Sequence, residues 1–341
     1  MAVKLFFDFI KYTLLVFVFF TPVDSLSQER ITIPVLKGEI KFDGVVDDAA
    51  WDNIGQLKMV MHTPTFGNEP TEKSEVMICY TNSYLYIGAR LFDSEASKML
   101  VTSKKRDENS NSNESFTIVF DSFNDKENAL IFSTTPSGLR SDYTVFNDAI
   151  ENGPRNKPFN ESWNTFWDVK TTRNGQGWFL EMRIPFSSLR FKEDGGSVVM
   201  GMSFSRRIAH KNEVDVFPAI PPEWGPTSNL RPSKAQEVLF DGVKSKKPFY
   251  IAPYAIAGVQ QDYVLNEAGT DYVKGQSPKL NAGLDAKYGL TNNLTLDLTL
   301  NTDFAQVEAD DQQINLTRFS LFFTEKRTFF KERSSIFSFG F

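Results

Sequence analysis

The sequence has little of the chemistry that most metal and nucleophile sites require. Its 341 residues include one cysteine, Cys79, and two histidines, His62 and His210. A single cysteine excludes an intramolecular disulfide and a cysteine-rich metal site, and two histidines leave little for zinc chemistry or a Ser-His-Asp triad. We therefore expect neither a cofactor nor a metal site. Cys79 lies in the apolar run 76–80, which predicts a buried core position.

Positive charge and phosphate-binding loops are scarce as well. The chain carries 37 Lys and Arg against 43 Asp and Glu, a formal net charge of -6. That balance does not indicate a nucleic-acid partner. The sequence also has no glycine-rich phosphate loop. What remains is a binding, structural or hydrolytic protein without nucleotide chemistry.

The longest hydrophobic run lies near the N-terminus. Lys4 and Lys11 precede the apolar residues 12–20, and Ser25-Leu26-Ser27 closes the segment. Lysines, a short apolar run and small residues are the pattern of a cleaved secretory signal, because the run is too short to span a membrane as a helix. We expect residues 1–27 to be a signal peptide and Gln28 to begin the mature, exported chain.

The following region has the spacing of an all-β protein. Short runs rich in Val, Ile, Phe and Tyr alternate with clusters of Asn, Asp, Gly and Ser, which favours an antiparallel, jelly-roll-like β-sandwich. The runs are residues 75–80, 84–92, 115–121, 128–133, 178–184 and 198–205. Thr81-Asn82-Ser83 predicts a hairpin turn between the first two runs. Two proline-containing loops, at 154–158 and 218–232, are long enough to be functional.

The stretch DGVVDDAAW, residues 43–51, raises the question of a catalytic acid cluster. Adjacent Asp47 and Asp48 point in different directions, whereas acid–base catalysis needs two carboxylates facing each other across a substrate. We interpret the stretch as a turn at Asp43-Gly44 and a short capped helical turn that buries Trp51 under the sandwich.

Three other tryptophans are predicted to pack in the core. Trp163 and Trp167 are four residues apart and are expected to share one strand face with Val169. Trp178 precedes an apolar strand. Core packing is the commoner role for such residues, although a sugar platform at Trp163 and Trp167 is the alternative.

Trp224 differs because it stands in the proline-rich loop AIPPEWGPTSNLRPSK, residues 219–234. Glu223 is adjacent to it, and Asn229 and Arg231 follow. An aromatic ring among polar side chains suits the rim of a ligand site, but a loop tryptophan can equally pin its loop. These four residues are the candidate ligand-binding set.

The segment DENSNSNE, residues 107–114, begins like a calcium loop. Asp107, Asn109 and Asn111 have the spacing of the first three EF-hand ligands. Ser112 replaces the required glycine, and Ile118 occupies the place of the bidentate glutamate. The segment is therefore predicted to be a solvated loop.

Strict apolar–polar alternation appears near the C-terminus, over residues 280–290 and 294–301. Such alternation is typical of transmembrane β-strands with an apolar face towards lipid, although a soluble sheet with one wet face gives the same pattern. The leucine-only face and the preceding strand FYIAPYAIAG favour the membrane. Residues 248–341 can hold about four to six strands and a closed barrel needs about eight, so we interpret 246–341 as the start of a truncated, incomplete outer-membrane β-barrel.

Four segments, taken in order, resemble carbohydrate-binding module family 9, a β-sandwich of the DOMON-like type. They are IKFDGVVDDAAW, NSYLYIGARLFD, FDSFNDKENALIFSTTPSGLRSD and GWFLEMRIPFSSLRF. The resemblance spans about residues 30–243. It implies glycan binding that supports carbohydrate catabolism. The family's first clamp tryptophan would fall within 109–113, which reads NSNSN, and its arginine would fall near Ser133, so both are absent here.

Residues 280–332 look like the uncharacterised region that follows such modules in Gram-negative outer-membrane proteins. The chain departs from that pattern at Thr302, Thr324 and Thr328, where proline is expected. No chemistry follows from the motif at 303–333. The resemblance implies contact with outer-membrane lipid through residues 248–341 and a location in the outer membrane or periplasm.

The expected organisation is a signal peptide (1–27), a family 9-like sandwich (28–245) and a barrel-like domain (246–341). The leading hypothesis is non-catalytic glycan binding. A glycoside hydrolase acting on O-glycosyl bonds is an alternative, because such modules usually accompany one, but no carboxylate pair can be singled out. A third hypothesis is a structural or transport role in which the sandwich caps a barrel and binds nothing.

Overall fold

The structure is a computed structural model. It describes residues 29–302 apart from 109, 111, 152–156, 162, 245–248 and 292–293. The predictions for the signal peptide and for the motif at 303–333 lie outside the described residues. Among the residues described, no helix is both long and apolar enough to cross a membrane.

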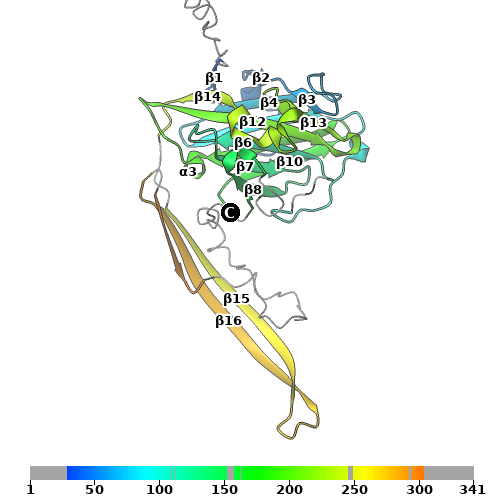
Figure 1. Cartoon of the computed structure of the whole chain (residues 1–341), viewed down its shortest axis with the longest axis vertical. Coiled ribbons are helices and arrows are strands. Elements are labelled where there is room, and N and C mark those ends of the chain that lie inside the picture. The colour runs from blue at the N-terminus through cyan, green and yellow to red at the C-terminus, as the bar shows by residue number, and fades with distance from the viewer. Residues whose placement is uncertain are drawn as a thin grey trace, which may run out of the picture. The chain divides into compact units, whose positions relative to one another are not determined.

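The described chain is nearly all β, and its strands form three sheets (Figure 1). The first has the order β1 (Ile31–Thr32), β14 (Gln236–Asp241), β12 (Ser197–Ile208), β6 (Ser115–Asp121), β7 (Ala129–Thr134), β8 (Arg140–Val145) and β9 (Phe159–Asn160), with β13 (Glu213–Phe217) joining β12 to β3 (Val60–Thr63). The second has the order β10 (Asp168–Asn174), β11 (Gly177–Pro185), β5 (Tyr84–Phe92), β4 (Ser74–Tyr80) and β2 (Gln56–Leu57). All pairings in these two sheets are antiparallel except β1 with β14.

Helices are short and lie between strands. They are α2 (Ala49–Asp52), α3 (Phe186–Leu189) and the 3-10 turns η1 (Ala96–Lys98), η2 (Asn147–Ala149), η3 (Ala209–Lys211), η4 (Pro222–Trp224), η5 (Ser228–Leu230) and η6 (Pro232–Lys234). The predicted sandwich is confirmed, because each of the six predicted runs lies on a strand and Thr81-Asn82-Ser83 joins β4 to β5.

The main core lies between the first two sheets. Side chains alternate across a strand, so one face of each strand points into this layer. On β4 the core residues are Val76, Ile78 and Tyr80. From the other sheet, β6 contributes Phe116, Ile118 and Phe120 to this core. The sandwich is therefore held by apolar side chains of both inner faces.

A second apolar cluster covers the outer face of the five-stranded sheet. It contains Trp51, Met77 and Cys79. Met77 and Cys79 lie on β4, where they alternate with the main-core residues Val76, Ile78 and Tyr80. Trp51 is 0% exposed, and its ring lies where a β-carbon on Gly88 would come within 3.0 Å of it. Trp51 is thus buried, but against the outside of one sheet and not between the two. Burial raises the pKa of Cys79 to about 12, which leaves an inert thiol.

Glu181 on β11 explains the stretch DGVVDDAAW. Its Oε2 accepts the backbone N–H groups of Asp43 and Gly44, both at 2.8 Å, and its Oε1 accepts the Trp51 indole N–H at 3.0 Å. Gly44 has a φ of +84°, and a side chain there would lie 2.7 Å from the backbone of β10. The turn at Asp43-Gly44 is present. The predicted cap is not, since Asp48 makes no side-chain cap and its Oδ2 accepts the Lys41 N–H at 3.0 Å.

The shared strand face predicted for Trp163 and Trp167 is wrong. β10 begins at Asp168, after both residues. The two rings instead pack edge-on around Phe132, with ring centres 6.2 and 5.4 Å from it. Trp167 is 2% exposed and Trp178 is 0% exposed, so both lie in the core.

The third sheet consists of β15 (Phe249–Leu265), β16 (Tyr272–Gly289) and β17 (Thr295–Leu300), all antiparallel. Residues directly opposite each other share a face. One face carries Phe249, Ile251, Pro253, Ala255 and Ala257 on β15, Leu280, Ala282, Leu284, Ala286 and Tyr288 on β16, and Leu296, Leu298 and Leu300 on β17. The opposite face of β16 and β17 carries Asn281, Asp285, Lys287, Thr295, Asp297 and Thr299. The alternation predicted from the sequence therefore places apolar residues on one face of this sheet and polar residues on the other.

Candidate functional site

The four residues predicted to bind ligand lie in the loop that follows β13. Trp224 ends η4 and is 47% exposed. Glu223 beside it is exposed. Asn229 and Arg231 are half-buried, and the Asn229 Nδ2 donates to Ser205 Oγ on β12 at 3.3 Å. The loop therefore presents the ring and one carboxylate to solvent, while the amide is engaged inside.

Asp148 holds this loop, and the sequence did not indicate it. Its Oδ2 accepts hydrogen bonds from Arg231 Nε at 2.9 Å and Nη2 at 2.6 Å. Its two oxygens also accept Ser233 N–H and Oγ–H, at 2.9 and 2.7 Å. Asp148 is 9% exposed, in a left-handed turn with φ of 49°. Such a charge-assisted, multidentate contact is strong, so Asp148 fixes the part of the loop that contains Arg231 and Ser233.

Two cations lie beside the Trp224 ring. Lys234 Nζ is 3.6 Å from the ring centre, and the Arg231 guanidinium carbon is 5.7 Å from it. Cations over an indole are attracted by its negative face. The arrangement combines an aromatic platform with hydrogen-bond donors, which suits a ligand that offers both a flat apolar face and polar or acidic groups.

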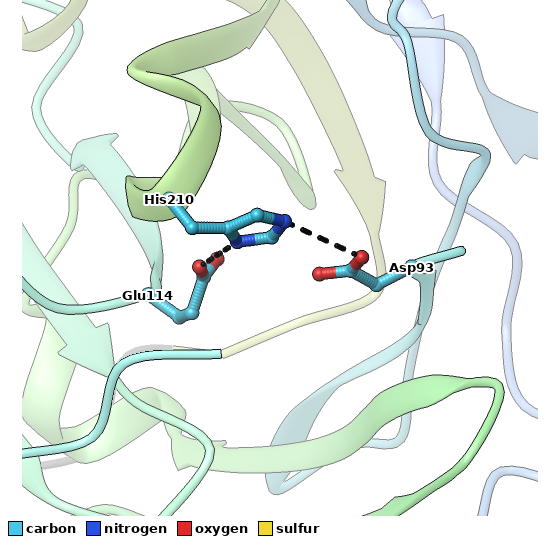
Figure 2. Close-up of side chains that lie close together, drawn as sticks. All are labelled: Asp93, Glu114 and His210. Atoms are coloured by element: carbon cyan, nitrogen blue, oxygen red, sulfur yellow. Dashed lines mark hydrogen bonds and ion pairs between the residues drawn. The ribbon is translucent and has the colours of Figure 1, made fainter. Parts of the chain in front are cut away.

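A second polar group lies inside the sandwich. Asp93 follows β5, Glu114 precedes β6 and His210 lies in η3 after β12. His210 Nδ1 is 2.9 Å from Glu114 Oε1, and His210 Nε2 is 3.6 Å from Asp93 Oδ1 (Figure 2). Asp93 is 2% exposed, Glu114 is 0% exposed and the His210 side chain is 8% exposed. One ligand atom from each residue lies within 4.8 Å of the other two.

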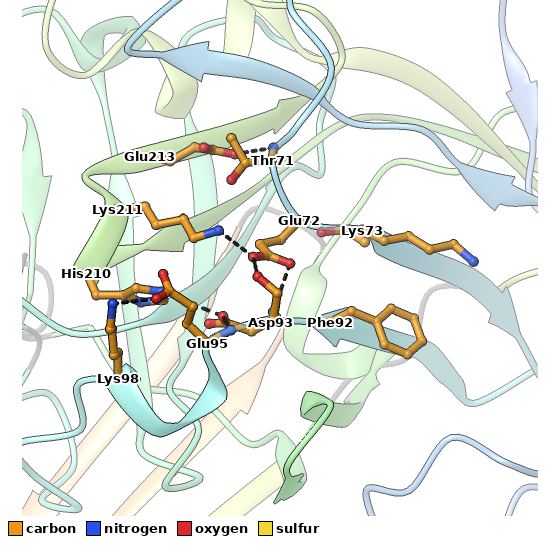
Figure 3. Close-up of polar contacts among 12 residues, drawn as sticks. Thr71, Glu72, Lys73, Phe92, Asp93, Glu95, Lys98, His210, Lys211 and Glu213 are labelled. Carbon is orange, nitrogen blue, oxygen red and sulfur yellow. Dashed lines mark hydrogen bonds and ion pairs between the residues drawn. The ribbon is translucent and has the colours of Figure 1, made fainter.

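Further charged residues surround this cluster (Figure 3). Lys211 pairs with Glu72, and Ser94 donates to the same carboxylate from its backbone and hydroxyl. Burial alone would raise the pKa of Glu72, but these hydrogen bonds outweigh it and lower the pKa. Asp215, opposite Arg206 in the β12–β13 pair, is buried. Burial, reinforced by Glu213, raises the pKa of Asp215 to about 8.

The calcium-like segment ends in this cluster, although its predicted ligands do not form a site. Asn109 and Asn111 lie outside the described residues, and Asp107 Oδ1 accepts the Asp142 N–H at 3.4 Å. Asn113 is 1% exposed and its Oδ1 accepts Thr102 N–H at 3.1 Å. The next residue, Glu114, reaches the buried histidine. The sequence offered one signal for this cluster: an acidic residue, Asp93, directly follows the apolar run 84–92, and another, Glu114, directly precedes the apolar run 115–121.

Parts of the chain are similar to a known family and to solved structures. Residues 250–340 match a family described as Domain of unknown function (DUF5916). No curated protein matches the chain. Two similar solved structures are of a carbohydrate-binding module of family 9 from Caldicellulosiruptor kristjanssonii. In the complex with cellotriose, the module is 17% identical to this chain, with a TM-score of 0.42, and the match covers 64% of this chain and 95% of that one. In the complex with glucose, the identity is 16% and the TM-score is 0.43, and the match covers 64% of this chain and 97% of that one. A third is a putative carbohydrate-binding protein from Bacteroides uniformis. It is 10% identical to this chain, with a TM-score of 0.48, and the match covers 63% of this chain and 100% of that one.

Proposed function

We propose that the chain is a non-catalytic glycan-binding protein whose ligand stacks on Trp224. The observation that carries this proposal is that the ring is 47% exposed on a loop already fixed by Asp148. An indole that is about half exposed is available for contact with a sugar face. The resemblance of four sequence segments to carbohydrate-binding module family 9 supports the same ligand class.

The neighbours of Trp224 define which glycans suit the site. Lys234 and Arg231 place positive charge at the ring, and Glu223 is free to approach sugar hydroxyls from the exposed side. Stacking gives contact area, while charged groups give orientation. We expect glycans that carry carboxylate or sulfate groups to bind more tightly than neutral ones, and we place the protein in carbohydrate catabolism as a capture component.

Trp224→Ala should weaken glycan binding by about 1 to 3 kcal/mol, the range found when an aromatic stacking platform is removed. The melting temperature should stay nearly unchanged, because the ring contributes little to the core. A glycan array followed by calorimetry on the best ligand measures both quantities. Phe66→Ala is the matched control, since Phe66 is also an exposed aromatic at 39% but lies outside this loop.

Two results would contradict the proposal. If Trp224→Ala binds as tightly as the native chain, the ring is not the platform. If no glycan on a broad array binds, the hypothesis that the sandwich caps a barrel takes its place. Release of sugars from labelled oligosaccharides by the native chain would instead favour the glycoside hydrolase.

Export is proposed from the sequence of residues 1–27. In a Gram-negative host, mass spectrometry of the envelope protein should find Gln28 as the first residue, because the small residues 25–27 suit signal cleavage. A chain that retains Met1 in the cytoplasm would contradict export by this route.

A second proposed function is contact with outer-membrane lipid through the third sheet. Its apolar face is solvent-exposed: Leu280 is 84% exposed, Leu298 is 56% exposed and Leu300 is 68% exposed. Contiguous exposed apolar surface marks a protein or membrane contact. In flotation experiments the full chain should rise with lipid vesicles and need detergent for extraction, and a chain that stays in the soluble fraction would contradict the proposal.

A further inference from the structure

Two buried carboxyl groups lie on the same face of one strand. Glu213 and Asp215 are two residues apart on β13, and successive side chains of a strand point to opposite faces. Glu213 is 2% exposed and Asp215 is 0% exposed. We propose that these two groups share one proton at neutral pH, and that loss of this proton at alkaline pH releases β3, β13 and the loop that they carry, residues 218–234.

The first observation behind this proposal is that Asp215 has no hydrogen-bond donor. Both of its side-chain oxygens are buried without a partner. Arg206 lies opposite it on β12. That guanidinium donates instead to Lys73 O at 3.1 Å, to Ser74 Oγ at 2.9 Å and to Phe92 O. A buried carboxylate without a donor is costly, so the neutral, protonated form of Asp215 is favoured.

Glu213 gives this proton an acceptor. Burial is the largest cause of the raised pKa of Asp215, and the charge of Glu213 and a side-chain hydrogen bond between the two groups add to it. Glu213 Oε1 also accepts the Thr71 N–H at 2.8 Å (Figure 3). With one proton between them the two carboxyl groups bind each other, whereas two ionised groups would repel.

The other charged groups nearby do not supply the missing donor. Three further carboxylates act on Arg206 together with Asp215, namely those of Glu72, Asp93 and Glu114. Lys211 pairs with the first of these, and His210 contacts the other two. The positive charge of Arg206 is therefore shared among four carboxylates. It lowers the pKa of Asp215 less than burial and Glu213 raise it.

The pair lies at the base of the loop that carries Trp224. β13 is hydrogen-bonded to β12 on one side and to β3 on the other, and among the described strands β3 pairs with β13 alone. β13 leads directly into residues 218–234. His62 on β3 holds that loop, because its ring nitrogens contact Ile220 O at 2.8 Å and Ser228 Oγ at 3.3 Å. Repulsion within β13 therefore loosens both strands and the loop together.

The direction of the pH effect follows from the pKa of Asp215, which rises from its ordinary value of 3.8 to about 8 in the folded chain. Between these two values the folded chain holds one proton more than the unfolded chain. Its stability is therefore complete below the lower value and falls as the pH rises towards the upper one. Above the upper value this group causes no further loss.

Asp215→Asn tests the proton, because asparagine is of similar size and cannot ionise. Urea unfolding of the full chain in detergent, followed by tryptophan fluorescence, reports the sandwich, since all five tryptophans lie within residues 51–224. Relative to the variant, the native unfolding equilibrium constant should rise about 50-fold from pH 6 to pH 8, close to tenfold per pH unit below the folded-state pKa. Parallel pH profiles of the two proteins would overturn the proposal.

Glu213→Gln tests whether the proton is shared. Glutamine removes the neighbouring charge and can donate to Asp215, so the loss of stability should begin at a lower pH than in the native chain. Asp168→Asn is the matched control, because Asp168 is an exposed carboxylate on β10 and its removal should leave the native pH profile intact. A profile that Glu213→Gln does not change would contradict a shared proton.

A measurement on the native chain covers the case in which a variant does not fold. With carboxyl-labelled aspartate, NMR should show an aspartate that titrates near pH 8, whereas ordinary aspartates are ionised by about pH 5. If every aspartate signal has finished titrating by about pH 6, well above the ordinary range, Asp215 is ionised at neutral pH and the proposal fails.

Hydrogen exchange tests the release of the loop. Any effect on glycan binding rests on the proposed function, but this readout needs no glycan. Exchange in residues 60–63 and 213–217, divided by the rate of unprotected amides at the same pH, should accelerate from pH 6 to pH 9 in the native chain and not in Asp215→Asn. Acceleration spread evenly over the sandwich, or absent from both strands, would overturn the release. A failure of Trp224→Ala to weaken glycan binding would leave this result unaffected.

Discussion

Trp51→Ala should lower the free energy of unfolding by about 3 to 5 kcal/mol, the range for removing a large aromatic side chain from a core. Three features place it there. The ring is 0% exposed, it packs flat on Gly88, where any added side chain would meet it at 3.0 Å, and its N–H donates to Glu181 Oε1 at 3.0 Å. Alanine would leave a cavity and would also leave Glu181 Oε1 buried without its donor.

Trp51→Phe separates these two causes. Phenylalanine keeps most of the apolar contact but cannot donate a hydrogen bond, so its cost should be about 1 to 3 kcal/mol, the penalty for an unsatisfied buried acceptor. Urea denaturation followed by circular dichroism measures both variants. Glycan affinity per folded molecule should be unchanged in each. A loss below about 1 kcal/mol for Trp51→Ala would contradict the core assignment, since it falls outside the range for such cavities.

The strands were predictable because successive side chains of a strand point to opposite faces, so an apolar residue at every second position indicates one buried face. In the run 76–80, however, every position is apolar, and Val76 and Met77 indeed pack on opposite faces of β4. Such a run indicates that both faces are covered. It does not indicate which segment covers the outer face, so the sequence predicted a buried Trp51 without naming the sheet that it covers.

The polar sites were less predictable, because they depend on strand pairing far along the chain. His210 and Glu114 are 96 residues apart in sequence, and they meet because β12 pairs antiparallel with β6. Asp148 likewise reaches Arg231 across 83 residues. The exposed Trp224 could be singled out because prolines and polar residues surround it locally.

In the third sheet, the strand pairing shows how far along the apolar face each leucine lies, so the cost of a charge can be predicted for each position. Its apolar face runs from the pair Phe249 and Tyr288 to the pair Ala257 and Leu280, about 26 Å of strand at about 3.3 Å per residue. For strands tilted by about 40°, this length covers about 20 Å of a lipid-facing band of about 25 Å. The two rings at one end, with centres 6.0 Å apart, are typical of an interfacial aromatic girdle.

Leu300→Arg should therefore destabilise the protein in a bilayer by about 2 to 4 kcal/mol, the cost of arginine at the midplane of a barrel's lipid face. Leu300 lies opposite Leu284, which pairs with Pro253 at the middle of the apolar stretch. Leu296→Arg should cost only about 0 to 1 kcal/mol, because Leu296 lies in the row of Tyr288 near the interface.

Thr299→Arg is the control for the same depth on the opposite face. Thr299 lies beside Asp285, so an arginine there gains a carboxylate partner and does not meet lipid; it should be tolerated. Urea titrations of the full chain in phosphocholine vesicles give the three unfolding free energies. The order Leu300→Arg, then Leu296→Arg, then Thr299→Arg supports lipid contact through the leucine face. Equal costs at Leu300 and Thr299 would show instead that the sheet is a soluble one with two wet faces, and the proposal of outer-membrane contact would have to be abandoned.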